Sequence, residues 1–225
     1  MFRSRTRAVI FTQHEHARLA AELALAWRRE EIPLPFNSFV RGVALHDRGF
    51  DVLDADDIDA LSLERYLAIQ RSGAVPRGED PVVDLVVALH IRRLAASRPW
   101  RAQFVGELDA LLPRLYHAAG VSEEAALASD RVTEVSDRVS FDFCFEEPAS
   151  DEVAGITYAV DGRGTITLHP WPLVVPRMAG LIVGYRADGY PRDLEPVIVS
   201  YEVVAAANVP THDVGTVRRR ERLEP

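Results

Sequence analysis

The stretch Val43-Ala44-Leu45-His46-Asp47-Arg48-Gly49-Phe50 decides how this chain is interpreted. Its first residues close the apolar stripe of a helix predicted from about residue 35, and His46 and Asp47 continue that stripe. Gly49 follows where such a helix is expected to end. A buried imidazole beside a buried carboxylate is costly unless something pairs with both, and a divalent metal ion is the most economical partner. The stretch therefore predicts a metal site at the end of a helix.

Three further polar side chains fall on helix faces that otherwise consist of core residues. His16 lies on the apolar face of a helix predicted over residues 13–31. His90 lies on a helix that begins after Asp80-Pro81, a capping residue followed by proline at the first helical position. Asp137 lies on the last long helix, predicted to reach about residue 145. Helices packed in a bundle can direct such side chains to one interior point, which favours a shared metal site.

Each of these residues also has a plainer interpretation. A lone histidine on an apolar helix face is usually a core histidine with a hydrogen-bond partner. Asp47 could pair with its neighbour Arg48, and Asp137 could pair with Arg138. Asp130 competes with Asp137 for the place of the last ligand. The coincidence of several inward-facing polar residues is what favours the metal.

The chain changes character near residue 148. Before it the pattern is helical, and after it short strand patterns alternate with Gly/Pro turns such as Asp161-Gly162-Arg163-Gly164. We therefore expect a mainly α fold, a helical bundle over residues 1–148. Residues 149–207 would add a small antiparallel β-sheet packed on the same domain (α+β overall), and residues 208–225 a flexible tail.

Composition excludes several function classes. The chain has 225 residues and a formal net charge of -8, which argues against a nucleic-acid partner because phosphate contacts need a dense basic face. Its basic side chains are all arginine, so lysine Schiff-base chemistry and a lysine-dependent phosphate loop are excluded. The single cysteine, Cys144, fits a reducing cytoplasm, and no apolar run approaches the roughly 20 residues of a membrane helix. We expect a cytoplasmic protein with no membrane partner, whose exposed strand edges would allow a homodimer.

The order His, then His-Asp, then Asp on successive helices resembles the HD-domain superfamily of metal-dependent phosphohydrolases. Nearly all of residues 8–204 resembles, more closely, an uncharacterised bacterial family, domain of unknown function 3891, thought to share that HD-domain-like helical fold. The matching segments are Gln13-His14-Glu15-His16-Ala17-Arg18-Leu19, Val43 to Phe50, Val87-Ala88-Leu89-His90-Ile91-Arg92-Arg93-Leu94, Ser136-Asp137-Arg138-Val139-Ser140-Phe141 and Pro170-Trp171-Pro172-Leu173. The resemblance implies His16, His46, Asp47 and Asp137 as metal ligands, while His90 matches a family histidine of unknown role.

The function expected from these residues is that of a metal-dependent phosphohydrolase. A divalent ion (Mn, Fe or Zn) would activate a water molecule for attack on a small phosphorylated substrate or a nucleotide. His90 would act as general acid to the leaving oxygen, and Arg48 would hold the phosphate charge, with Arg92 or Arg93 as alternatives.

Two other functions compete with hydrolysis. Some HD-like proteins are thought to hold two irons and to oxidise organic substrates, and His90 as an additional ligand would favour such a di-iron oxidase or oxygenase. The chain could also be a non-catalytic metal- or metabolite-binding module, because a fold does not establish an activity.

Overall fold

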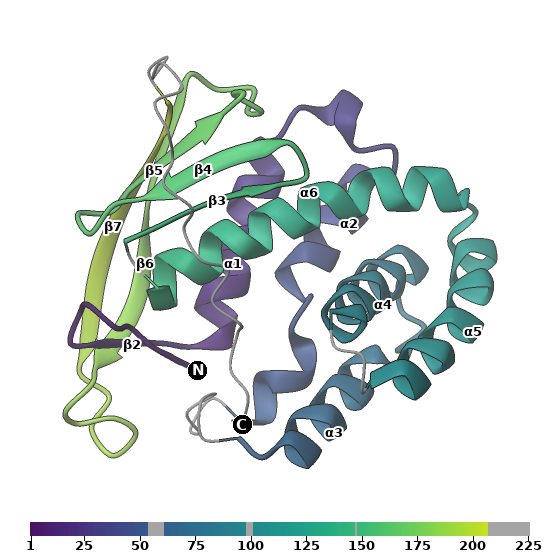
Figure 1. The fold of residues 1–225 in the computed structure, drawn as a ribbon, viewed down its shortest axis with the longest axis horizontal. Helices are drawn as coiled ribbons and strands as arrows, with labels where there is room; N and C mark the ends of the chain where they lie inside the picture. Colours follow the sequence, from purple (N-terminus) through teal and green to yellow (C-terminus); the bar gives the residue numbers. More distant parts are fainter. Residues whose placement is uncertain (54–60, 98–100, 147, 207–225) are drawn as a thin grey trace.

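The computed structural model describes residues 1–53, 61–97, 101–146 and 148–206. Figure 1 shows a helical half and a curved β-sheet lying against each other. The α-helices are α1 (Gln13–Ala26), α2 (Phe36–Ala44), α3 (Leu63–Ala74), α4 (Pro81–Ala96), α5 (Ala102–Ala119) and α6 (Glu123–Phe141). Short helical turns are η1 (Arg29–Glu31), η2 (Arg48–Leu53) and the π-turn η5 (Asp142–Glu146).

Several helices begin at a side-chain cap. The hydroxyl of Thr12 accepts a hydrogen bond from the backbone N–H of Glu15 at the start of α1, and Ser122 does the same for α6. Asp80 caps α4 in front of the proline at its first position. Such side chains satisfy backbone donors that the first helical turn leaves unpaired. The predicted starts of these helices are therefore set by local chemistry.

Helix α4 lies in the middle of the helical half, with α2, α3, α5 and α6 around it (Figure 1). Residues 82–91 are buried without interruption, as expected of a helix surrounded on all sides. Gly42 of α2 lets the two backbones approach closely, because a Cβ at this position would lie 2.7 Å from the Cβ of Val86. Helix α2 is thereby held tightly against the central helix.

The sheet has seven strands in the order β1-β2-β6-β7-β5-β4-β3. Every neighbouring pair is antiparallel except β5 and β7, which run parallel. The strands are β1 (Phe2–Arg3), β2 (Val9–Phe11), β3 (Ala149–Val153), β4 (Ile156–Val160), β5 (Thr165–His169), β6 (Arg177–Arg186) and β7 (Pro196–Ala205).

The expected mainly α fold with a small antiparallel sheet is wrong, because the chain has an α+β fold with a seven-stranded mixed sheet. Two strands come from the N-terminus, where Val9, Ile10 and Phe11 of β2 are all buried. Strand β2 pairs with β6, far along the chain, so no local hairpin signal marks it. The parallel β5–β7 pair likewise needs a crossover that short-range turn patterns do not reveal.

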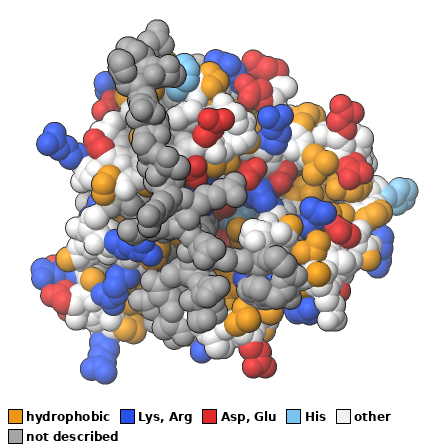
Figure 2. All heavy atoms as spheres, in the orientation of Figure 1, with side chains coloured by type: hydrophobic (Ala, Val, Ile, Leu, Met, Phe, Trp, Pro, Cys, Tyr) orange, Lys and Arg blue, Asp and Glu red, His pale blue; other side chains and the backbone are white. Residues whose placement is uncertain are grey.

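Helices α1 and α6 contact the sheet on one side and the other helices on the other. The main hydrophobic core lies between them, with Phe11, Phe143 and Tyr158 among its fully buried side chains. No helix in the described ranges combines the length and the apolar character that a membrane crossing requires. In the same orientation, Figure 2 shows acidic and basic side chains interspersed over the visible face. The predicted tail, residues 208–225, lies outside the described residues.

Candidate metal centre

Three segments bring His16, His46, Asp47 and Asp137 together in the interior. His16 lies in the first turns of α1 and Asp137 near the end of α6, and these two helices pack against each other. Helix α2 ends at Ala44, and Leu45 leaves helical geometry with φ -114° and ψ 11°. Neighbouring residues within a helix point about 100° apart. Because His46 and Asp47 follow the helix end, both can direct their side chains to one point.

The distances among these four side chains match a metal coordination shell. The Nε2 atoms of His16 and His46 lie 3.2 Å apart. His16 Nε2 lies 3.6 Å from Asp47 Oδ2 and 3.3 Å from Asp137 Oδ1. The corresponding separations from His46 Nε2 are 3.6 and 3.5 Å. Ligand atoms about 2.0–2.1 Å from a tetrahedral zinc ion lie roughly 3.3 Å from one another, so an ion of this kind fits between them.

Hydrogen bonds on the far side of each ring leave both Nε2 atoms without a proton when the imidazoles are neutral. His46 Nδ1 lies 2.6 Å from the carbonyl oxygen of Val43, which can only accept, so Nδ1 carries the proton. His16 Nδ1 lies 2.9 Å from Ser140 Oγ, and that hydroxyl donates to the carbonyl oxygen of Asp137. Ser140 therefore accepts from His16. Two lone pairs and two carboxylates then face one point, an arrangement that requires a cation there.

The acid–base properties of the cluster agree with this requirement. Burial alone would lower the pKa of His16, but hydrogen bonds to Asp137 and Asp47 outweigh it and raise the pKa to about 9. Burial would raise the pKa of each carboxyl group, yet the neighbouring imidazoles hold the pKa of both Asp47 and Asp137 well below its usual range. Without a metal, the cation is thus a proton on His16. A divalent metal ion would replace that proton.

His90 joins the cluster from α4 and faces Asp47. Its Nε2 lies 3.3 Å from Asp47 Oδ1, and its Nδ1 lies 3.0 Å from a guanidinium nitrogen of Arg93. A guanidinium has no acceptor, so Nδ1 of His90 accepts and Nε2 donates to Asp47. Burial, the largest influence, lowers the pKa of His90 despite the nearby carboxylates. His90 is therefore a neutral hydrogen-bond donor to a candidate ligand.

Arg48, predicted to hold a substrate phosphate, turns away from the cluster. Its guanidinium donates to the carbonyl oxygens of Gly73 and Val75 and to Asp84 Oδ1, the last at 2.9 Å. Both side chains of the ion pair are almost completely buried, with 1% and 3% exposure. Arg48 therefore ties the segment after Asp47 to the end of α3 and to α4.

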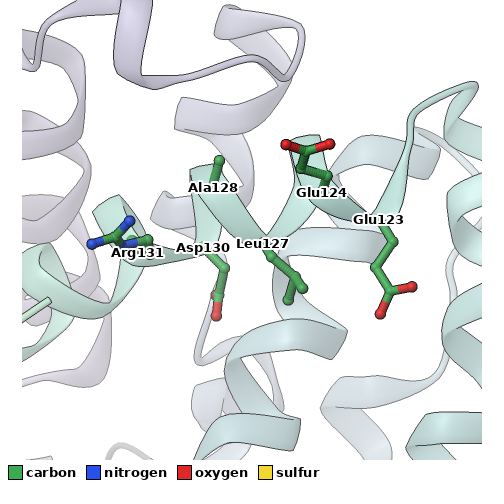
Figure 3. Close-up of a pocket in the computed structure, with 6 residues that line it drawn as sticks. All are labelled: Glu123, Glu124, Leu127, Ala128, Asp130 and Arg131. Atoms are coloured by element: carbon green, nitrogen blue, oxygen red, sulfur yellow. The ribbon is translucent and has the colours of Figure 1, made fainter.

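Asp137, and not Asp130, reaches the two imidazoles. Asp130 pairs instead with Arg93. The larger hollow on the surface, ≈ 740 Å³, also lies away from the cluster along the first turns of α6 (Figure 3). Its lining residues are Glu123, Glu124, Leu127, Ala128, Asp130 and Arg131.

A small cavity adjoins the cluster itself. It measures ≈ 10 Å³, room for about one water molecule, and His46, Asp47 and Gln70 are among its lining residues. Gln70 also accepts a hydrogen bond from Arg101 and donates one to the hydroxyl of Tyr66. Burial, together with the charge of Asp47, raises the pKa of Tyr66 to about 12. This polar group on the α3 side is the nearest described part of the protein that an additional ligand could meet.

Two supporting residues received no role from the sequence. Ser140 sets the proton of His16, and the signal that could have identified it is its position three residues after Asp137 on the same buried helix face. Asp84 neutralises Arg48, and its position inside an apolar helix marks it as a buried charge in need of a partner.

A family model described as a protein of unknown function, DUF3891, matches residues 1–180, and the chain belongs to this family. That match confirms the family expected from the sequence, while the likeness to HD-domain hydrolases stays a prediction. No curated protein and no solved structure matches the chain.

Proposed function

We propose that this chain binds a divalent transition-metal ion through His16, His46, Asp47 and Asp137 and hydrolyses a small phosphomonoester or nucleotide. The observation that carries the proposal is the convergence of two Nε2 atoms and two carboxylate oxygens, with nitrogen–nitrogen and nitrogen–oxygen separations of 3.2–3.6 Å. Imidazole nitrogen and carboxylate oxygen are ligands that zinc, iron and manganese accept. A core histidine cluster without a cation would need other partners for these lone pairs.

The reaction class follows from the donor set and from the order of the motifs. A divalent ion, when bound, acidifies a water molecule and polarises a phosphoryl oxygen. The order His16, His46-Asp47 and Asp137 along the chain resembles that of the HD-domain phosphohydrolases, which supports hydrolysis of a phosphate ester. The carboxylates keep 11% and 12% of their side-chain surface exposed, whereas the imidazoles of His16 and His46 are fully buried. We infer that a substrate reaches the centre from the carboxylate side.

The chain's other residues support the ligands and balance charge. His90 orients Asp47 through its Nε2 proton, which fits this geometry better than the general-acid role expected from the sequence. Of the three arginines considered for phosphate binding, Arg48 is bound to Asp84 and Arg92 to Asp109. Arg93 contacts His90 and is the described cation best placed to attract a phosphate group.

The test is hydrolysis by protein reconstituted with Mn²⁺, Fe²⁺ or Zn²⁺, assayed on a panel of phosphomonoesters and nucleotides. We expect turnover with at least one ion, and loss of turnover in Asp47→Asn. Asp109→Asn removes a carboxylate from an exposed ion pair on α5 and is the matched control, expected to behave as the wild type. Tight metal binding without turnover across the panel would contradict hydrolysis and leave a non-catalytic metal-binding module.

A further inference from the structure

Two overlapping groups of side chains could each hold an ion. His16, His46 and Asp137 form one group, and His46, Asp47 and His90 form the other. In each group the ligand atoms lie within 4.8 Å of one another. The number of ions at this centre therefore depends on whether both groups can be occupied together.

His46 cannot serve both groups at once. Its Nδ1 is held by the carbonyl oxygen of Val43, which leaves a single lone pair, on Nε2. That atom lies 3.2 Å from His16 Nε2, on the side of the first group. A second ion would consequently depend on His90 and on carboxylate oxygens.

His90 is not free to act as a ligand through Nε2 in this arrangement. Its Nε2 carries a proton and donates to Asp47 Oδ1 because Nδ1 accepts from Arg93. Releasing Nε2 would require a proton on Nδ1, which would then face the guanidinium at 3.0 Å. Two donors would oppose each other there, at an additional electrostatic cost.

The guanidinium of Arg93 is itself fixed in place. Another of its nitrogens forms an ion pair with Asp130, and both side chains are largely buried, with 19% and 13% exposure. His90 Nδ1, which receives its proton, lies 3.7 Å from Asp137 Oδ2. A fixed positive charge therefore sits beside His90, close to a carboxylate of the cluster.

We propose that the centre holds one divalent ion, and that the Arg93 guanidinium, anchored on Asp130, takes the place of a second ion by keeping the proton of His90 on Nε2. The inference rests on the proposed metal site and specifies its stoichiometry. It also explains why a buried arginine–aspartate pair lies next to the cluster rather than apolar packing.

The test is Mn²⁺ stoichiometry by equilibrium dialysis and elemental analysis of the full chain. We expect one ion per chain in the wild type and two in Arg93→Met, the second being lost again in the double variant Arg93→Met/His90→Gln. Arg92→Met removes the adjacent arginine, which pairs with Asp109 at the exposed side of α4, and should still bind one ion. Electron paramagnetic resonance of the Arg93→Met protein should show two coupled Mn²⁺ ions.

The outcomes separate this inference from the proposed function. Two ions in the wild type would overturn the single-ion centre while leaving the metal site intact, and no ion would overturn the metal site itself. One ion in folded Arg93→Met would overturn the role of Arg93. If that variant does not fold, ¹⁵N NMR of wild-type His90 decides the question: a protonated Nε2 supports the inference, and a protonated Nδ1 overturns it.

Discussion

At the scale of single residues, the positions of protons on the imidazoles determine what the cluster can bind. Val43 and Ser140 each accept a proton from the far side of a ring, so the lone pairs of His46 and His16 point inward. Arg93 does the opposite for His90, whose proton points toward Asp47. Supporting contacts of this kind orient metal ligands and influence affinity.

Ser140→Ala should weaken metal binding by roughly 10–100-fold, the effect typical of losing a contact that orients a ligand. The change leaves the Nδ1 proton of His16 without its acceptor. Ser129→Ala is the matched control, since Ser129 is also a buried serine of α6 with a side-chain hydrogen bond to the preceding turn. Isothermal titration with Zn²⁺ measures both variants. Equal affinity in Ser140→Ala and the control would argue against a ligand role for His16.

Arg48→Met should destabilise the fold by about 3–5 kcal/mol, because it leaves the Asp84 carboxylate buried without its partner. Arg92→Met, which breaks an exposed pair, should change the free energy of unfolding by no more than about 1 kcal/mol. Urea denaturation gives both values. Wild-type stability of Arg48→Met combined with loss of phosphatase turnover would restore the phosphate-binding role expected from the sequence.

At the scale of elements, the end of α2 positions the His-Asp pair. The sequence predicted the helical positions of the site well, because caps, apolar stripes and the glycine after Asp47 are local signals. It could not predict that α2 ends before His46, which is what lets adjacent side chains converge. The strands were predicted less well, since β2 and the parallel β5–β7 pair depend on contacts distant in sequence.

Gly42→Ala should destabilise the protein by roughly 1–3 kcal/mol through overpacking, because the new methyl group would meet Val86 at 2.7 Å. Since α2 carries His46 at its end, metal affinity should fall as well. Gly106→Ala, in α5 with nothing within 4 Å of the added atom, should instead stabilise the protein by about 0.4–1 kcal/mol. Thermal denaturation and Zn²⁺ titration test the pair. Unchanged stability of Gly42→Ala would show that α2 can shift away from α4 at no cost.

At the scale of the whole molecule, the centre joins three segments that otherwise belong to different parts of the fold. His16 comes from a helix packed on the sheet, His46 and Asp47 follow a helix packed on α4, and Asp137 comes from α6, which contacts both halves. A ligand that binds all of them stabilises the native state and not the unfolded chain. Metal binding should therefore be coupled to global stability.

The stabilisation by Zn²⁺ should increase as the pH rises from about 6.5 to 9. In the metal-free protein the pKa of His16 is raised to about 9. Its proton therefore contributes stability that is complete below about pH 6.5 and is lost as the pH rises through 9. A metal ion must displace this proton, so its apparent affinity grows over the same range. Melting temperatures with Zn²⁺ and with chelator measure the difference, and a gap that narrows with rising pH would contradict the account.

The most direct test of the central claim is the metal content of the chain purified without chelator and then dialysed against a single divalent ion, beside Asp47→Asn. The account predicts one tightly held ion per chain in the wild type and little or none in the variant, with both proteins folded. Absence of metal from the wild type after dialysis against manganese, iron and zinc in turn would contradict it, and would leave the five residues as a polar network closed by the proton of His16.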